Sequence, residues 1–335
     1  TLTFGVVYSA QANAATYAVG PTKQYKNLGQ VTNLLSPGDL VLVDGDATYP
    51  GGVAFWNAGT SSQKITIRGV RINGKRPVVS GGTDTIEAAG NHYVFEGLDL
   101  TGGSFRCFFH HADDITLRDS VVHDCAAHGV LGADSDSGDL LMEYDEVYGC
   151  GNGTSQHQIY IATDETAYPD SVFRMRHCYV HDATGGNNVK SRAERNEIYY
   201  NWIQGAQYHE LELIGPDGQN PSLAREDSDV VGNVLAKTAT SYVVRFGGDG
   251  TGASDGRFRF VNNTVITQPG GSAVFRLFDG IESLSAHNNV FYAAGGGSVN
   301  LVRMVEADWT SGSAKMPSSA NAGQANAVRR VRLCR

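Results

Sequence analysis

The sequence predicts an all-β protein that forms a single parallel β-helix domain of about ten rungs. Three observations lead to this fold class. Short segments with alternating apolar residues recur along the chain, Asn and Gly stand where these segments end, and long stretches with a 3.6-residue period are almost absent. A strand that alternates buries only one face, so each repeat must complete its core on its neighbours, as in a solenoid.

The repeated element is an alternating strand, then a Gly, Asp or Asn, then a second short apolar strand. The five clearest copies begin at Ile65, Tyr93, Ile115, Leu141 and Phe173. Looser copies begin at Arg192, Ser228, Phe258 and Leu284. The starts lie 19 to 36 residues apart, and repeats of this size indicate a solenoid.

The corners between strands favour a parallel β-helix over other solenoids. Leucine-rich repeats would need a fixed L-x-x-L-x-L frame, which is absent. The segments "VVGNV" (230–234), "VNNTV" (261–265) and "HNNVF" (287–291) place Asn or Gly between strands. Asn tolerates the left-handed backbone of a tight corner, and identical Asn side chains can stack as ladders.

Composition limits the partners of the protein. The 335 residues carry a formal net charge of −9, which argues against nucleic acid, because a nucleic-acid binder needs a broad basic surface. An acidic protein that acts on an anionic ligand needs a local basic patch. We therefore expect no nucleic acid as partner, and we also expect no membrane span and a monomer.

The two ends of the chain differ from the repeats. An apolar run ends in Ala12-Asn13-Ala14, a pattern typical of a signal-peptide cleavage site. We expect residues 1–14 to be a signal-peptide remnant of a secreted or periplasmic protein, although an ordinary first strand is the alternative. We expect residues 15–305 to form the β-helix and the Ala- and Ser-rich residues 306–335 to be a disordered tail.

Cysteine spacing gives a weaker prediction. No C-x-x-C motif occurs among the five cysteines, so zinc or thioredoxin-type chemistry is not expected. Cys125 and Cys150 follow similar strands one rung apart. We expect them to form either a bridge or a stacked buried pair, because a rung spacing near 4.8 Å suits both arrangements.

A cluster of charges stands out in a chain that is only 18% charged. In residues 188–194, "NVKSRAE", the small or apolar Val189 and Ser191 should point inward, so Lys190 and Arg192 should point outward. The same alternation places Tyr160, Glu210, Glu212 and Arg245 outward on neighbouring strands. If these strands share one sheet, their side chains form a polar patch about four rungs tall.

At this point the sequence resembles a known group. The segments "LLSPGDLVLVDGDATYPGGVAFWNAGTSSQKITIRGV" (34–70) and "NNVKSRAERNEIYYN" (187–201) resemble right-handed parallel β-helix polysaccharide lyases of the alginate lyase and chondroitinase B type. The similarity covers Gly29 to Tyr292. It implies a right-handed, pectin-lyase-like solenoid and a lyase that cleaves a uronate-containing polysaccharide by β-elimination.

The chemistry of β-elimination suggests roles for the patch. The proton that is removed lies next to a carboxylate, so a cation must neutralise that carboxylate and a base must reach the proton. Lys190 is the candidate base, and Arg192 or Arg245 is the candidate partner of the carboxylate. Tyr160 or His181 would protonate the leaving oxygen.

The remaining candidates are substrate-binding residues. His209 precedes the outward Glu210 and would reach the patch, and Glu212 would contact substrate or neutralise the neighbouring cations. In the lyase group two acids before the Lys hold calcium, but no acid lies between Asp182 and Lys190. The sequence therefore requires no cofactor.

Calcium remains possible at a second set of acids. Glu210, Glu212 and Asp217 have the carboxylate density that suits a hard cation. The lyase group also carries an Arg where this chain has Ile214, so only Lys190 and Ser191 match the pattern.

Two alternative functions remain open. A non-catalytic carbohydrate binder or adhesin would use aromatic platforms, and the chain has 15 Tyr and 3 Trp. A polygalacturonase-type hydrolase would need clustered aspartates, for which only Asp113-Asp114 is a candidate.

Overall fold

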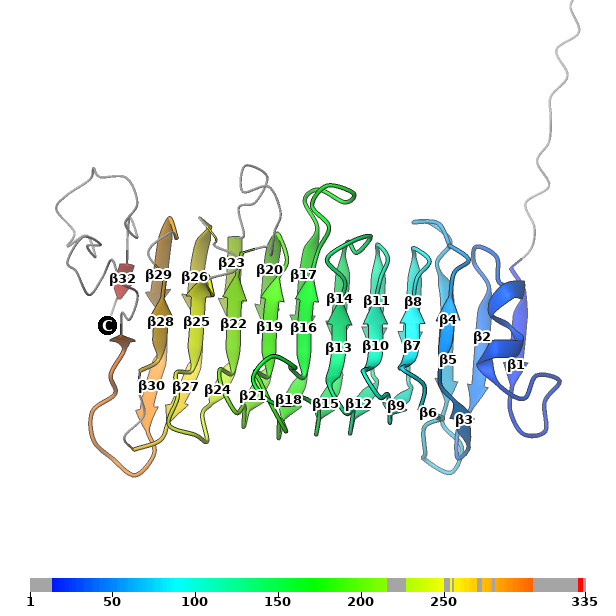
Figure 1. Ribbon diagram of the computed structural model, residues 1–335, viewed down its shortest axis with the longest axis horizontal. Helices are drawn as coiled ribbons and strands as arrows, with labels where there is room; N and C mark the ends of the chain where they lie inside the picture. Colours follow the sequence, from blue (N-terminus) through cyan, green and yellow to red (C-terminus); the bar gives the residue numbers. More distant parts are fainter. Residues whose placement is uncertain are drawn as a thin grey trace, which may run out of the picture.

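The structure is a computed structural model, and it describes residues 14–215, 227–249, 254, 256–269, 273–278, 281–303 and 331–333. Three parallel sheets wind into a long β-helix (Figure 1), which confirms the fold class. We call the 12-stranded sheet A and the two 10-stranded sheets B and C. One rung is one turn of the chain through A, B and C.

The elements have the following bounds. Sheet A contains β1 (Thr16–Val19), β2 (Leu40–Asp44), β5 (Ile65–Val70), β8 (Tyr93–Glu96), β11 (Ile115–Arg118), β14 (Leu140–Glu143), β17 (Val172–Arg176), β20 (Arg195–Tyr199), β23 (Asp227–Val231), β26 (Arg257–Val261), β29 (Ser283–His287) and β32 (Val331–Leu333). Sheet B contains β3 (Thr48–Pro50), β6 (Val78–Ser80), β9 (Asp99–Thr101), β12 (Val121–His123), β15 (Glu146–Tyr148), β18 (Tyr179–His181), β21 (Trp202–Gln204), β24 (Val234–Ala236), β27 (Thr264–Thr267) and β30 (Val290–Ala293). Sheet C contains β4 (Val53–Phe55), β7 (Asp84–Ala88), β10 (Arg106–His110), β13 (His128–Gly132), β16 (Ile159–Ala162), β19 (Val189–Arg192), β22 (Leu211–Ile214), β25 (Val244–Gly247), β28 (Phe275–Leu277) and β31 (Val302–Arg303). The short 3-10 helices are η1 (Leu28–Gln30) and η2 (Thr32–Leu34).

The repeat pattern marks the strands of sheet A. Eight of the nine repeat starts fall within strands of that sheet between β5 and β29, whereas Arg192 is the last residue of β19 in sheet C, three residues before β20 begins. The inward residues of the three sheets are fully buried and form one continuous core. Near the first rungs this core contains Phe55, Tyr93, Phe95 and Phe108, whose rings lie edge to face or stacked. Alternation alone therefore predicted which side of each strand is buried.

An asparagine ladder lines the inside of the corner between sheets A and B, as the corner sequences predicted. Asn201, Asn233, Asn263 and Asn289 occupy equivalent positions of successive rungs. Each Oδ1 accepts a hydrogen bond from the backbone N–H of the preceding rung, and each Nδ2 donates to a carbonyl of that rung. The ladder satisfies backbone groups that would otherwise be buried without partners.

Asp145 occupies the same ladder position on the rung of β14. Its Oδ1 accepts from the N–H of Ser120 at 2.9 Å, whereas its buried Oδ2 has no hydrogen-bond partner in the described part of the chain. Burial raises the pKa of this carboxyl well above its ordinary value. An acid whose protonated form is favoured by burial thus stands in the position that Asn201, Asn233, Asn263 and Asn289 occupy on other rungs.

We expect Asp145→Asn to stabilise the protein by about 1–3 kcal/mol at pH 7, because the amide can donate at any pH, whereas the acid can donate only while it keeps its proton. In the wild type, the contribution of protonated Asp145 to the free energy of unfolding is fully present below the unfolded pKa near 3.9. It is lost as pH rises through the raised folded pKa. The gap between variant and wild type should therefore widen above about pH 4. Urea unfolding of both proteins from pH 4 to 8 measures it, and a variant less stable than wild type at pH 7 would contradict the ladder argument.

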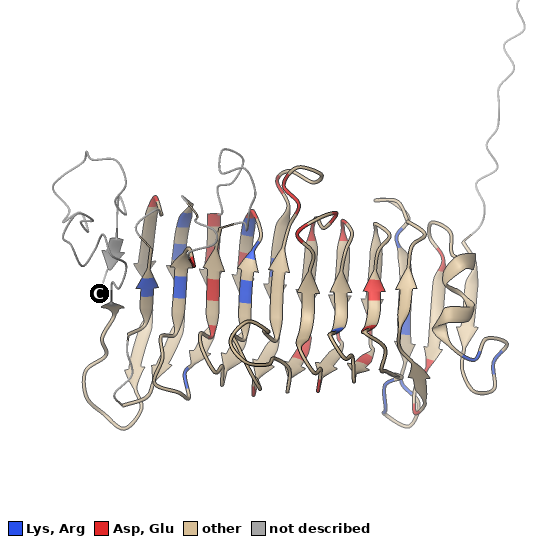
Figure 2. Cartoon of the chain, in the orientation of Figure 1, with Lys and Arg blue, Asp and Glu red and all other residues tan. Residues whose placement is uncertain are grey.

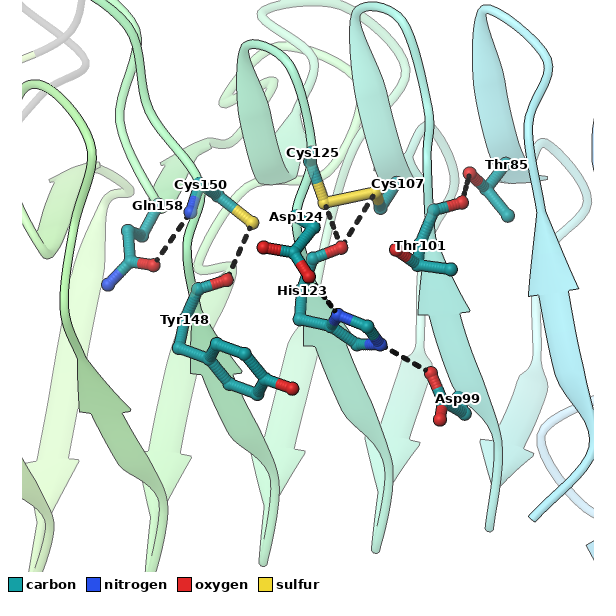
Figure 3. Close-up of a disulfide and its surroundings, with 10 residues drawn as sticks. All are labelled: Thr85, Asp99, Thr101, Cys107, His123, Asp124, Cys125, Tyr148, Cys150 and Gln158. Carbon is teal, nitrogen blue, oxygen red and sulfur yellow. Dashed lines mark hydrogen bonds and ion pairs between the residues drawn. A yellow bond between two sulfur atoms is a disulfide. The ribbon is translucent and has the colours of Figure 1, made fainter.

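One disulfide connects neighbouring rungs, but it is not the one that spacing suggested. Cys107 and Cys125 are bridged with a Cα–Cα distance of 5.9 Å (Figure 3), and Cys150 is a free buried thiol. Cys107 points inward from β10 and reaches the corner after β12. The bridge, one of the two arrangements expected for Cys125 and Cys150, is therefore excluded, because Cys125 pairs with an inward cysteine of sheet C. Both residues are nevertheless buried at similar corners.

The predicted domain limits are tested only in part. The expected signal-peptide remnant lies almost entirely outside the described residues, and so does most of the expected tail. Val331–Leu333 differs from the expectation of disorder, because it forms β32 and pairs in parallel with β29. Within the described ranges, no helix is long and apolar enough to cross a membrane.

Candidate functional site

The predicted polar patch lies on the outer face of sheet C. Five outward residues stand in register on successive strands from β16 to β28, and we call them the outer row: Tyr160, Lys190, Glu212, Arg245 and Arg276. Figure 2 shows the row as blue on β19, β25 and β28 and red on β22. Neighbouring side chains of the row start about 4.8 Å apart.

The strand register confirms which side chains of this sheet were predicted to point inward and which outward. Val189, Leu211 and Val244 form the inward column beside the row, and all three are fully buried. Lys190 and Glu212 point the other way on paired positions of β19 and β22. The side chain of Lys190 is only 11% exposed, so neighbouring side chains cover most of it.

Asp249 joins two cations of this patch. Its Oδ2 accepts from Lys190 Nζ at 3.0 Å and from Arg192 Nη2 at 2.7 Å. Arg192 also donates from Nη1 to the carbonyl of Gly215 at 2.6 Å. Gly215, directly after β22, and Asp249, shortly after β25, thus hold Arg192, which is only 2% exposed although its strand position points outward.

Tyr160 completes this cluster. Its Oη accepts a hydrogen bond from Arg192 Nε at 2.8 Å, and Lys190 Nζ lies 4.9 Å from the centre of its ring. Burial raises the pKa of the Tyr160 phenol, and Arg192 opposes this shift. The phenol therefore keeps its proton at neutral pH and has a guanidinium beside it that would stabilise the phenolate.

Glu212 and Arg245 pair with each other further along the row. Arg245 Nη1 lies 3.1 Å from Glu212 Oε1, and the Asn187 amide donates to the other carboxylate oxygen. The Arg245 guanidinium also lies over the ring of Phe278, 4.5 Å from its centre. Glu212 thus neutralises a neighbouring cation, one of the two roles that the sequence left open.

Glu210 does not belong to the outer row, which corrects our expectation. It precedes the first residue of β22, so strand alternation does not govern its direction. Its carboxylate is fully buried in the corner, where it accepts from Asn188 Nδ2 and the N–H of Ala206 and lies 3.4 Å from Lys237 Nζ. Burial raises the pKa of Glu210 and lowers that of Lys237. This pair is a structural feature of the corner.

His209 lies beside the row but is buried. Its Nδ1–H donates to Asn187 Oδ1 at 3.2 Å, and among the described residues its Nε2 has no hydrogen-bond partner. Burial holds the pKa of His209 well below its ordinary value, and the positive charges of Arg245 and Arg276 add to this effect. The imidazole is therefore neutral and is not placed to hold an anionic substrate by charge.

His181 was expected near the patch, and this expectation is wrong. It ends β18 in sheet B, whereas the outer row belongs to sheet C. Its ring nitrogens lie 2.8 Å from an Asp182 oxygen and 3.2 Å from a Glu146 oxygen, and its ring stacks between Tyr148 and Tyr179. The repeated His-Asp pair is corner chemistry, the alternative that the sequence had left open.

His123 shows the same arrangement two rungs earlier (Figure 3). It hydrogen-bonds to Asp99 and Asp124, each at 2.8 Å, and stacks on Tyr148. The hydrogen bond that His123 donates to Asp99 is the main cause that raises the pKa of His123 to about 9. Both of its ring nitrogens therefore act as donors at neutral pH.

Sequence reasoning missed two residues of the site. Asp249 lies in a loop after β25, where no alternation applies, and nothing in its sequence neighbourhood links it to Lys190. Arg276 was detectable, because Phe275 and Leu277 flank it as inward residues in the same way that Val244 and Phe246 flank Arg245.

Of the three residues suggested for calcium, the two that the structure describes are directed to different cations. Glu210 is directed to Lys237 and Glu212 to Arg245, while Asp217 lies outside the described residues. Over the described ranges, no group of three or more His, Cys, Asp or Glu side chains has a geometry that would hold a metal ion. The calcium expectation therefore remains untested, and no step below involves a metal.

Solved structures with the same fold include two polysaccharide lyases. The chain matches pectate lyase Pel9A with a TM-score of 0.63 at 13% identity, covering 95% of this chain and 89% of that one. It matches an alginate lyase from Paenibacillus sp. str. FPU-7 with a TM-score of 0.58 at 17% identity, covering 86% and 98%. No family model and no curated protein matches the sequence. The predicted resemblance is thus confirmed at the level of the fold.

Proposed function

We propose that this protein cleaves an acidic, uronate-containing polysaccharide by β-elimination at the outer row of sheet C. The observation that carries the proposal is the carboxylate of Asp249, which Lys190 and Arg192 hold between them. Two cations thus meet at one carboxylate beside the hydroxyl of Tyr160. A substrate carboxylate that displaces Asp249 would meet the guanidinium of Arg192, with the Lys190 amine beside it to act as the base.

The proposed chemistry uses three side chains. The substrate carboxylate pairs with Arg192, which neutralises it and makes the proton on the adjacent carbon more acidic. Lys190, in its neutral form, takes this proton. The electron pair forms a carbon–carbon double bond, the bond to the leaving oxygen breaks, and Tyr160 gives its proton to that oxygen.

The surroundings of Tyr160 support its role as the acid. Burial keeps the phenol protonated before the reaction, and the Arg192 Nε–H that it accepts would stabilise the phenolate afterwards. Tyr160 and Lys190 belong to adjacent strands of one outward column, so both protons would move on the same face of the sugar chain. Arg245 and Arg276 extend the row and would bind further carboxylates of the polymer.

The hydrolase alternative has less support. Asp114 pairs with Lys64 at 2.5 Å and with His92 at 2.9 Å, and Asp113 accepts from the N–H of Asp139. These contacts lie in the corner before β11 and not on the outer face of sheet C. The two aspartates are therefore engaged in holding the turn.

We further propose that the protein acts outside the cytoplasm. The Cys107–Cys125 disulfide supports this, because structural disulfides persist in oxidising compartments. Fractionation of the native host, followed by detection with an antibody, would test it.

The activity is tested by incubating the protein with a panel of uronate polysaccharides that includes polygalacturonate and alginate. We expect one of them to yield an unsaturated product, seen as a rise in ultraviolet absorbance. Binding without any such rise across the panel would favour the non-catalytic binder. New reducing ends without absorbance would favour a hydrolase.

A further inference from the structure

We propose that a hollow beside Tyr144, at the corner between sheets A and B, is a second binding site for the acidic polysaccharide. This inference takes the class of polymer from the proposed function but concerns a different face of the molecule. The hollow has a volume of about 510 Å³ and is lined by Arg68, Gly69, Glu96, Gly97, Arg118, Asp119 and Tyr144. None of these residues belongs to sheet C.

The first argument is the backbone of the corner. The residue that turns the chain from sheet A to sheet B has a positive φ on successive rungs, and elsewhere it is a type that accepts this conformation, such as Gly97, Asp119 or Gly232. On three successive rungs it is aromatic instead: Tyr144, His177 and Tyr200, with φ of 59°, 56° and 57°. Tyr adopts this region at a cost, whereas His accepts it more readily, so Tyr144 and Tyr200 are the outliers that point to a function.

The second argument is the exposure of these rings. Tyr144 stacks on His177 at 5.1 Å between ring centres, and His177 stacks on Tyr200 at 5.6 Å. Tyr144 and Tyr200 are each 58% exposed, so the stack contributes little to the core. An exposed aromatic stack on a strained backbone needs a reason beyond folding.

The hollow lies on only one side of this stack. All its other lining residues come from the three rungs that precede Tyr144, so it faces the side of the Tyr144 ring away from His177. Gly69 and Gly97 provide no side chains there, and a Cβ at Gly69 would collide with the Gly97 carbonyl. At the Tyr200 end of the stack, the ring of Tyr200 lies against Gly232, so a hollow like the one beside Tyr144 has no room there.

The charged rim of the hollow has fixed geometry. Arg68 and Arg118 both pair with Glu96, the second at 2.7 Å, and Arg76 pairs with Asp119 at 2.6 Å. These pairs hold the pKa values of Glu96 and Asp119 below their ordinary values, so both stay ionised. Fixed guanidinium and carboxylate groups bind adjacent sugar hydroxyls with little loss of side-chain entropy.

The occupant that fits these features is one sugar unit of an acidic chain. Its apolar face would pack on Tyr144, its hydroxyls would reach Glu96 and Asp119, and its carboxylate would meet Arg118 or Arg68. The side chains of these two arginines are 41% and 50% exposed, so they are accessible. A polymer held at this site would remain close to the outer row and raise the effective substrate concentration there.

The test compares two alanine variants, one at a tyrosine that lines the hollow and one at a tyrosine that does not. Tyr144→Ala and Tyr200→Ala each remove an equally exposed tyrosine from the same corner column and one end of the same stack. Both are made in a Lys190→Ala background, so that turnover does not disturb binding. Affinity electrophoresis in gels that contain polygalacturonate, alginate or a neutral glucan measures polymer binding directly.

We expect Tyr144→Ala to bind the acidic polymer about three- to tenfold more weakly, with Tyr200→Ala and Tyr144→Phe unchanged. Circular dichroism melting confirms that all variants are folded. Equal affinities of Tyr144→Ala and Tyr200→Ala would overturn the proposal, and so would a protein that binds none of the polymers. Equal retardation by the neutral glucan would overturn the assignment of an acidic sugar.

These outcomes are separate from those of the proposed function. Loss of binding in Tyr144→Ala, with no product absorbance from the wild type on any polymer, would retain the hollow and reject the lyase. Product absorbance that depends on Lys190, with unchanged binding in Tyr144→Ala, would retain the lyase and reject the hollow as a binding site.

Discussion

Replacing Lys190 with alanine is expected to lower turnover by roughly 10²–10⁴-fold, the contribution of a positioned general base, while folding and polymer binding remain close to wild type. The side chain points outward from β19, and its principal contact is the ion pair with Asp249, so its loss removes little from the core. Product absorbance, affinity electrophoresis and thermal melting on the same preparation measure the three quantities.

Two further variants show whether the loss of turnover in Lys190→Ala reflects the role of Lys190 as the general base. Lys190→Arg keeps the charge but should be as inactive as Lys190→Ala, because a guanidinium does not lose its proton at any working pH. Arg192→Ala should lower both binding and turnover, and it should also lower the melting temperature, because Arg192 is buried and bonds to Tyr160, Gly215 and Asp249. Wild-type turnover by Lys190→Ala would place the base elsewhere.

The largest effect on stability is expected from Lys237→Met. This substitution leaves the carboxylate of Glu210, which is fully buried, without its cation. Breaking a buried ion pair from one side costs about 3–5 kcal/mol, measured here as the free energy of unfolding in urea. Activity per folded molecule should be unchanged, because neither residue belongs to the outer row.

A matched control is available in Lys75→Met. Lys75 makes the same kind of contact with Asp46, at 2.7 Å, but its side chain is 69% exposed. We expect little change in stability there, because solvent screens exposed pairs. The double variant Glu210→Gln, Lys237→Met should recover part of the loss. A small effect of Lys237→Met alone would show that the pair is solvated.

The fold followed from the sequence because a solenoid repeats one local rule. Each strand of sheet A alternates, and the Asn residues at the corners accept the backbone geometry that the turns need. The same rule predicted that Lys190, Glu212 and Arg245 lie in one outward column. In a solenoid, neighbouring strands follow from their order along the chain, so this rule needs no further information about strand pairing.

The failures have physical causes as well. Glu210 was assigned outward because alternation was extended one residue before β22 begins, and corner residues do not follow it. His181 belongs to another sheet of its rung, and short apolar segments do not reveal to which of three sheets they belong. Asp249 reaches Lys190 from a loop two rungs away, a contact that only the coiled chain creates.

The most direct test of the account is the mass of the products that the wild-type protein releases from its polysaccharide. Elimination forms a double bond and adds no water, so the account predicts, for every cut, one new chain end that is lighter by one water than the hydrolysis product. Mass spectrometry of the oligosaccharides reads this difference. Products that are all saturated and of full hydrolytic mass would contradict the account, because the outer row would then be adding water rather than removing a proton.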